Sequence, residues 1–210
     1  MQDPRFYSLV LHRLPHVGAV TYNRLVSLFG SPEAVLKQPN IQLESLLELE
    51  TLSVIQDFQS NPEQSAIGQK ALVDLEWIDA QPNVHLLSVA DTSYPELLQT
   101  IPNLPPLLFV RGDTHLLSLP QIAIVGSRNP SSGGGENAYR FAEFLAANGF
   151  AITSGLALGV DAAAHQGALA AQGKTIAVMG TGLDMIYPSR HRALAQQILE
   201  MGGALVSELP

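Results

Sequence analysis

Apolar residues recur at helical spacing in the first part of the chain, over about residues 5–80. Phe6, Leu9 and Val10, for example, share one face of a helix, so the pattern predicts a series of short helices. Between the first two helices, residues 14–18 read LPHVG. The proline and glycine predict a tight turn of the helix-hairpin-helix kind.

Ser31 and Pro32 are residue types that begin a helix, because a serine side chain caps the first turn and proline fits its first position. Further helices are predicted over residues 43–49, 54–60 and 63–80. Together these segments predict a small all-helical domain over residues 1–80.

The pattern changes after residue 80 to short apolar runs that predict strands. Two such runs, 84–88 and 107–111, are interpreted as a connector that adds edge structure to a sheet. From Gln121 onwards the strands and helices alternate: strands 122–125, 150–153, 175–179 and 204–207, and helices 138–148, 160–172 and 192–201. Unalternated apolar strands are typical of a parallel sheet covered on both faces, so residues 81–210 predict a doubly wound α/β domain.

Composition indicates a folded chain, because 46% of the residues are hydrophobic and only 14% are charged. No run approaches the roughly 18 apolar residues of a membrane span, and residues 1–14 lack the layout of a secretory signal. We therefore expect no membrane contact and a cytoplasmic location. The absence of cysteine excludes disulfides, thiolate metal sites and a cysteine nucleophile.

The net charge of −8 at first disfavours a nucleic-acid partner, because DNA binding neutralises phosphates. The acidity lies mostly in residues 1–120, with 6 Lys+Arg against 13 Asp+Glu, whereas residues 121–210 have 5 against 6. Since charge effects are screened within about 10 Å, a local arginine cluster can still hold an anion.

The turn after each parallel strand is where ligands of such sheets bind. The first strand is followed by Gly126, Ser127 and Arg128, and then by the small residues 131–135. Small residues let an anion approach the backbone, a helix N-terminus offers free N–H groups, and Arg128 adds a bidentate contact. This turn predicts a phosphate site, with a plain flexible loop as the alternative.

The second turn, 154–161, reads SGLALGVD, and His165 follows four residues after Asp161. That spacing puts the two side chains on one helix face, where an acid–base pair is conceivable. We favour another interpretation, in which Asp161 stabilises the helix start and His165 is a structural hydrogen-bonding residue. No further histidine or carboxylate in this turn completes a metal site.

The third turn, 180–185, begins with two glycines of a dinucleotide fingerprint but has Met185 at the third glycine position. No helix starts where a pyrophosphate requires one. Arg190, His191 and Arg192 follow, and either phosphate contacts or a solvated helix start explains them. Tyr187 either stacks on a base or packs beside its proline.

Motifs of catalysis are missing from the sequence. There is no GxSxG pentapeptide and no P-loop, and the GKT at 173–175 precedes a strand where a P-loop follows one. We therefore predict no catalytic residue, no metal and no cofactor.

Three strings together resemble bacterial DNA processing protein A, also called Smf: IAIVGSR at 122–128, SGLALGVDAAAH at 154–165 and TIAVMGTGLDMIYP at 175–188. The resemblance extends to SELP at 207–210, to YPELL at 94–98 and to LFVRGD at 108–113. The turn at 14–18 and the FGS at 29–31 are similar to the helical N-terminal domain of that family, a SAM or helix-hairpin-helix-like domain.

The resemblance implies an extended Rossmann-like fold and a non-enzymatic, cytoplasmic protein. It implies binding and protection of incoming single-stranded DNA during natural transformation, help in loading the RecA recombinase, and a homodimer. Arg128 would contact a DNA phosphate, and the turns at Gly126 and Gly155 would supply backbone donors. The full set of expected DNA-binding residues is Gly126, Ser127, Arg128, Ser154, Gly155, Leu156, Gly159, Gly180, Gly182, Arg190 and Arg192.

Members of this family continue past the SELP strand into an FPxRNR-like motif and further strands that complete the sheet, the DNA pocket and the main dimer contact. We therefore expect a sheet that is incomplete at its C-terminal side. We also expect weak DNA binding and no family-type dimer for these 210 residues.

Two other functions remain open. The lysine-decarboxylase-like phosphoribohydrolases, enzymes acting on nucleoside monophosphates, share a glycine-rich Rossmann sheet. Their PGGxGTxxE element is absent here, but its expected place lies after residue 210, so its absence argues only weakly against this function. The helical domain is alternatively a protein-interaction module whose acidic stretch 44–50 faces a partner, although a solvated helix face explains that stretch more simply.

Overall fold

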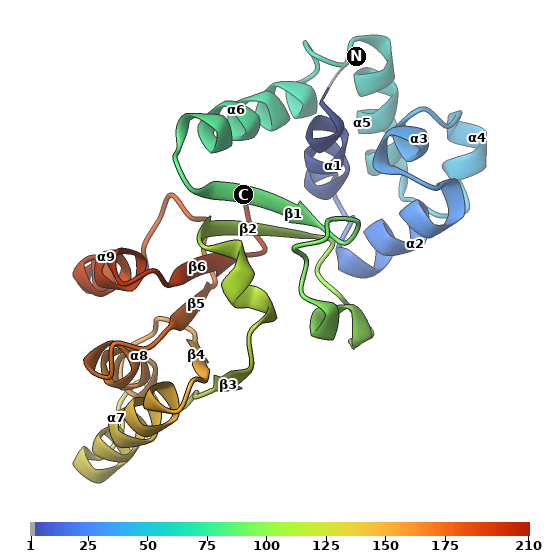
Figure 1. The fold of residues 1–210 in the computed structure, drawn as a ribbon. Helices are drawn as coiled ribbons and strands as arrows, with labels where there is room; N and C mark the ends of the chain where they lie inside the picture. Colours follow the sequence, from blue (N-terminus) through green and yellow to red (C-terminus); the bar gives the residue numbers. More distant parts are fainter. Residues whose placement is uncertain (1–2) are drawn as a thin grey trace. The chain divides into compact units, whose positions relative to one another are not determined.

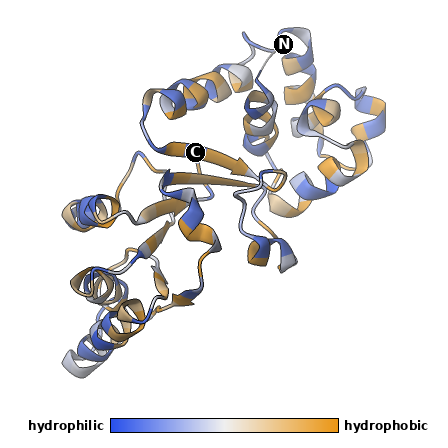
Figure 2. Ribbon diagram, viewed as in Figure 1, coloured by the Kyte–Doolittle hydropathy of each residue, from blue (hydrophilic) through white to orange (hydrophobic). Residues whose placement is uncertain are grey.

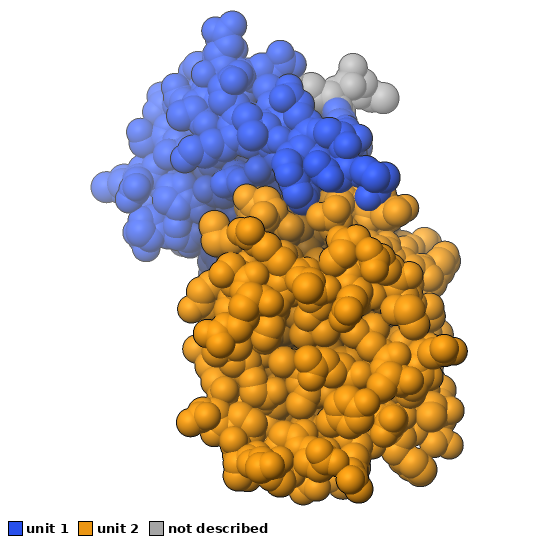
Figure 3. Space-filling view, turned by 90° about the vertical axis from the view of Figure 1, so that its left-hand side faces the viewer, with its two compact units in different colours: residues 1–82, 97–107 blue, residues 83–96, 108–210 orange. Residues whose placement is uncertain are grey.

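The computed structural model describes residues 3–210 (Figure 1). The chain divides into two compact units (Figure 3). The helical unit comprises the residues up to 82 together with 97–107, and the sheet unit comprises 83–96 and 108–210. The segment 97–107 is tied to the helices because the Asn23 side-chain amide donates to the carbonyl of Leu104 at 2.8 Å. The division into domains 1–80 and 81–210 stays a prediction.

The helical unit contains six α-helices within its described residues: α1 Pro4–Arg13, α2 Ala19–Phe29, α3 Pro32–Leu36, α4 Asn40–Leu43, α5 Leu49–Ser60 and α6 Ala66–Ala80. The predicted hairpin turn separates α1 from α2. The predicted start at Ser31 is confirmed, because its hydroxyl accepts the N–H of Ala34 at 3.1 Å and Pro32 occupies the first position. Helix α1 is central, since Phe6, Leu9 and Val10 are buried.

Three predicted helix ranges in this unit are wrong in their bounds. The helix expected over 43–49 is instead α4, which ends at Leu43, followed by turns in which Leu46 and Leu47 donate to the Leu43 carbonyl. Helix α5 begins at Leu49 rather than at residue 54. Helix α6 begins at Ala66 rather than at residue 63, because the Ser65 hydroxyl accepts the N–H of Gly68 and fixes the start.

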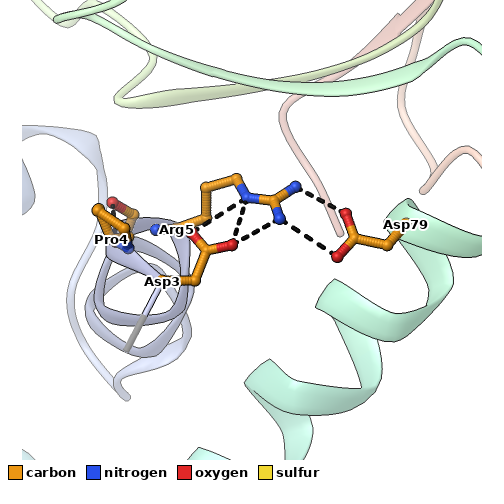
Figure 4. A network of polar contacts seen from close by, with 5 residues as sticks. Asp3, Pro4, Arg5 and Asp79 are labelled. Atoms are coloured by element: carbon orange, nitrogen blue, oxygen red, sulfur yellow. Dashed lines mark hydrogen bonds and ion pairs between the residues drawn. The ribbon is translucent and has the colours of Figure 1, made fainter. Parts of the chain in front are cut away.

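A polar network joins the start of α1 to the end of α6 (Figure 4). The Arg5 guanidinium binds the Asp3 carboxylate and, through Nη1, the Asp79 carboxylate at 2.8 Å. The Arg5 hydrogen bond lowers the pKa of Asp3 below its usual value. Because these side chains are partly exposed, the ion pairs contribute little stability, and the buried rings of Phe6 and Phe58, 5.9 Å apart, matter more.

The sheet unit is built on six strands in the order β1-β2-β6-β5-β4-β3. Their bounds are β1 Val84–Ser88, β2 Leu107–Gly112, β3 Gln121–Ala123, β4 Ala151–Ser154, β5 Thr175–Met179 and β6 Ala204–Ser207. Strands β3 to β6 are parallel, as predicted, and β2 pairs antiparallel with β6. The connector therefore extends the sheet, as expected. Figure 2 shows β1 and β2 as mainly hydrophobic, in agreement with the burial of Leu107 to Val110.

Helices α7 Ser132–Ala147, α8 Val160–Ala170 and α9 Arg192–Glu200 connect the parallel strands. They lie on one side of the sheet in Figure 1, as right-handed crossovers between successive neighbouring strands require. A core of small residues packs this layer: Ala142, Ala146, Ile152, Ala164 and Ala168. Three 3-10 helices complete the described residues: η1 Glu96–Thr100, η2 Thr114–Ser118 and η3 Ser189–His191.

The α/β, Rossmann-like class is confirmed. Helices α7, α8 and α9 lie on the same face of the sheet, which corresponds to one half of a doubly wound arrangement. Helices were predicted to cover both faces of the sheet. Among residues 3–210, helices cover one face of β3 to β5. Thr175 faces α8, because its hydroxyl bonds His165, and alternation along the strand directs Val178 to the opposite face. Val178 is 43% exposed and Val125, just after β3, is 72% exposed.

Candidate nucleic-acid interface

The first two glycine turns are locked together at the carboxyl edge of the sheet. The N–H of Val160 donates to the carbonyl of Ser127 at 3.1 Å. A Cβ added at Gly159, where φ is +79°, would lie 2.3 Å from that carbonyl, and one at Gly126 would lie 2.9 Å from the Val160 side chain. Gly126 and Gly159 are therefore needed because the two turns approach closely.

The start of α7 corrects the expectation of a glycine-rich loop. Residues 133–135 belong to the first turn of α7, which begins at Ser132 instead of residue 138. The hydroxyl of Ser131 accepts the N–H of Gly134 at 3.1 Å and fixes this start. The loop between β3 and α7 is thus shorter than predicted, and Ser127 shapes it by accepting the N–H of Asn129.

A hollow of about 270 Å³ is lined by residues of all three turns. These residues are Arg128, Gly155, Ala157, Leu158, Gly180, Thr181, Tyr187 and Pro188. The hollow brings together three of the predicted residues, Arg128, Gly155 and Gly180. Arg128 is exposed and forms no ion pair with any residue in the described part of the chain. Its guanidinium is available to an incoming anion.

Asp161 occupies the backbone donors of the second turn. Its Oδ2 accepts the N–H of Gly155 at 3.1 Å and that of Ala157 at 3.3 Å. A Cβ at Gly155 would lie 2.7 Å from the same oxygen. In this structure Asp161 already accepts that hydrogen bond, and the expectation that Gly155 offers its N–H to phosphate stays a prediction. Gly155 makes room for the carboxylate.

Three other expected ligand residues serve the turns themselves. Ser154 is buried and donates its hydroxyl to the Ile124 carbonyl at 2.6 Å. The side chain of Leu156 is 0% exposed. A Cβ at Gly182 would lie 2.5 Å from the carbonyl of Pro210, so Gly182 lies against the end of the chain after β6. The side chains of Ser154 and Leu156 are too buried to contact a ligand.

His165 is a buried structural histidine, and the conceivable acid–base pair with Asp161 is not formed. The Thr175 hydroxyl donates to the Ile152 carbonyl and therefore accepts from Nδ1 of His165 at 2.7 Å. Burial, and secondarily His191, lowers the pKa of His165 to about 4. Its Nε2 has no hydrogen-bond partner among residues 3–210. The favoured structural interpretation of His165 is confirmed.

The basic residues after the third turn are fixed next to the second turn. His191 donates from Nδ1 to the Leu156 carbonyl at 2.7 Å, which holds the start of α9 in place. Arg190 and Arg192 on either side of it are exposed, and neither forms an ion pair with another residue in the range 3–210. They flank the hollow-forming turns without lining the hollow.

Some lining residues were missed from the sequence. Ala157, Leu158 and Pro188 carry no charge or hydrogen-bonding side chain, so nothing in the pattern identified them. Thr181 was passed over between its two glycines, and its hydroxyl donates to the Met185 carbonyl at 2.6 Å. Among the lining residues outside the predicted set, only Tyr187 was a candidate in the sequence, because it follows an apolar strand and its turn.

Two features that residues 3–210 lack bear on other functions. No group of three or more His, Asp or Glu side chains there is placed to hold a metal ion. None of the helices in that range has both the length and the apolar character needed to cross a membrane.

Residues 85–210 match the sequence model of a protein family described as DNA recombination-mediator protein A. The chain belongs to this family. The match includes all three turns and the hollow between them.

Relatives in this family align over much of the chain. Protein Smf of Escherichia coli K12 is 45% identical over 160 residues, which are 76% of this chain and 41% of that protein. Protein Smf of Synechocystis is 36% identical over 211 residues, 97% of this chain and 50% of that protein. This chain thus spans about half the length or less of these relatives. Their names give no enzymatic activity.

Solved structures of family members have the same fold. DNA processing protein A from Streptococcus pneumoniae superposes with a TM-score of 0.64 and 29% identity, covering 99% of this chain and 68% of its own. The protein from Helicobacter pylori superposes with a TM-score of 0.52 and 34% identity, covering 59% of this chain and 55% of its own. That structure was reported for the way in which the protein binds single-stranded DNA.

Proposed function

We propose that the carboxyl edge of this sheet binds the backbone of single-stranded DNA. The observation that carries the proposal is the unpaired Arg128 guanidinium at a hollow lined by glycine backbone. A Cβ at Gly180 would meet no atom within 4 Å, so the Gly180 backbone is open on that side. Arg128 supplies the charge, and Arg190 and Arg192 extend the positive surface beside it.

The wider role we propose is that of a cytoplasmic, non-enzymatic mediator of recombination. It would protect incoming single-stranded DNA during natural transformation and help to load RecA. The family description as a recombination mediator and the DNA-binding relative from Helicobacter pylori support this role.

The test of DNA binding is a salt series with a labelled oligonucleotide, measured by fluorescence anisotropy. Because each phosphate contact releases counterions, Arg128→Ala is expected to make the slope of log affinity against log salt shallower by roughly one unit. An unchanged slope would remove Arg128 from the interface and contradict the proposal.

Arg140→Ala is the matched control for this experiment. Arg140 is an exposed arginine on α7 that pairs with Glu136 at 2.6 Å and does not line the hollow. Its loss removes the same formal charge, so a slope that changes equally in both variants would indicate a general charge effect instead of a site.

The enzymatic alternative gains no support from the site. The Asp161 carboxylate accepts two backbone N–H groups, and His165 is fully buried, so neither is positioned to transfer a proton to a ligand in the hollow. Incubation with nucleoside monophosphates is expected to release no free base, as measured by chromatography. Release that depends on Arg128 would favour the enzyme.

A further inference from the structure

Tyr187 is the aromatic side chain that lines the hollow, and it is largely exposed. Its residue is 70% exposed, and its ring makes no hydrogen bond or ring contact in the described part of the chain. Packing beside the proline therefore leaves most of this residue uncovered. Arg128 carries the charge of the same hollow, so a cation and a free aromatic ring face one shared space.

The segment that carries Tyr187 is held on both sides. Before it, the Thr181 hydroxyl donates to the Met185 carbonyl at 2.6 Å, and Leu183 is buried. After it, the N–H of His191 donates to the Pro188 carbonyl at 2.9 Å. A ring presented on a fixed segment loses little conformational freedom when a planar group stacks on it.

We propose that Tyr187 is the stacking platform for a nucleobase whose phosphate is held by Arg128, an inference that rests on the proposed DNA function. Pockets for a whole small-molecule ligand run from about 300 to 1,000 Å³, and this hollow of about 270 Å³ suits one unit of a longer strand. Aromatic rings stack on any base because every base has a π-face.

This pairing of contacts gives the site a preference for unpaired strands. In a duplex both faces of each base are covered by neighbouring base pairs, so Tyr187 has no face to stack on. Arg128 alone does not distinguish the two forms, because phosphates are present in both. Tyr187 is therefore the residue that distinguishes single strands from duplex at this edge.

The test compares Tyr187→Leu with Tyr187→Phe on a short single-stranded oligonucleotide and on a base-free strand of the same length. We expect Tyr187→Leu to weaken binding of the normal strand about 10-fold, and Tyr187→Phe to bind as the unchanged chain does. The base-free strand should bind about 10-fold more weakly to the unchanged chain but lose nothing further with Tyr187→Leu. The salt slope of Tyr187→Leu should be unchanged, since no phosphate contact is lost.

Met185→Leu serves as the control, because Met185 is exposed on the same segment and does not line the hollow. Equal binding of the normal strand by Tyr187→Leu and the unchanged chain overturns the stacking role. The stacking role is also overturned if the ratio of the affinities for the normal and the base-free strand is the same in Tyr187→Leu as in the unchanged chain. If Arg128→Ala changes the salt slope while Tyr187→Leu is silent, only stacking fails. If the unchanged chain does not bind the oligonucleotide, both proposals fail.

Discussion

At the scale of single residues, the glycine turns show that a small residue can serve packing as much as ligand approach. Gly126 and Gly159 allow two turns to touch, and Gly155 gives space to the Asp161 carboxylate. Only Gly180 among the glycines lining the hollow has open space where a side chain would project. The residues that remain free for a ligand are thus fewer than the glycine pattern predicts.

His165 predicts a loss of stability in acid. Its pKa is lowered to about 4 in the folded chain, whereas an unfolded histidine has a pKa of about 6.5. Between these values the unfolded state binds a proton that the folded state does not, so the free energy of unfolding falls as the pH drops from about 6.5 to about 4. The expected loss is roughly 3 kcal/mol, measured by urea unfolding across that range.

His165→Gln is expected to flatten this dependence, whatever its effect on stability at neutral pH. His115→Gln, which changes an exposed histidine, is the matched control. An equally steep dependence in His165→Gln would show that other groups cause the acid sensitivity.

At the scale of elements, the strands could be predicted because each is a short run of consecutive apolar residues bounded by small residues, a pattern that favours a buried strand. Strands β1, β5 and β6 have the predicted bounds, and β2, β3 and β4 shift by one or two residues. The starts of α6 and α7 were misplaced, because a serine cap sets each of them: Ser65 makes α6 begin later than predicted, and Ser131 makes α7 begin earlier despite the weak helix propensity of its three glycines.

The parts of the site that follow from the order of strands and helices along the chain could be predicted. Arg128 follows a strand directly, so its place at the sheet edge follows from topology. The bonds from Gly155 and Ala157 to Asp161 depend on the conformation of the turn, which includes a φ of +59° at Leu156, and no spacing rule reports that conformation.

The cap of α7 gives a prediction for this element. Ser131→Ala removes the acceptor for the N–H of Gly134 in a helix whose first turn contains three glycines, so a loss of about 1 kcal/mol in the free energy of unfolding is expected from urea unfolding. Ser132→Ala replaces the next residue, whose hydroxyl makes no hydrogen bond in the described range, and should cost less. Equal losses in both variants would mean that the cap contributes nothing.

At the scale of the whole molecule, acidity is unevenly shared between the units. The helical unit has 5 Lys+Arg against 10 Asp+Glu, a net charge of −5, and the sheet unit has 6 against 9, a net charge of −3. These charges favour the arginines of the sheet unit as the electrostatic contact to DNA.

This distribution predicts the salt dependence of the complete interaction. If Arg128, Arg190 and Arg192 supply the phosphate contacts, log affinity for single strands should fall with log salt with a slope of about −2. Replacing all three by alanine should bring the slope close to zero. A residual steep slope in that variant would place further contacts elsewhere, including the helical unit.

The pairing of β2 with β6 has a consequence for synthesis of the protein. Phe109 of β2 lies opposite Ser207, almost a hundred positions later in the chain. In a nascent polypeptide β1 is already available to pair with one edge of β2, but the other edge stays unpaired until β6 emerges, after α7 and α8 have been made. That interval is when chaperones or proteases gain their best access to β2.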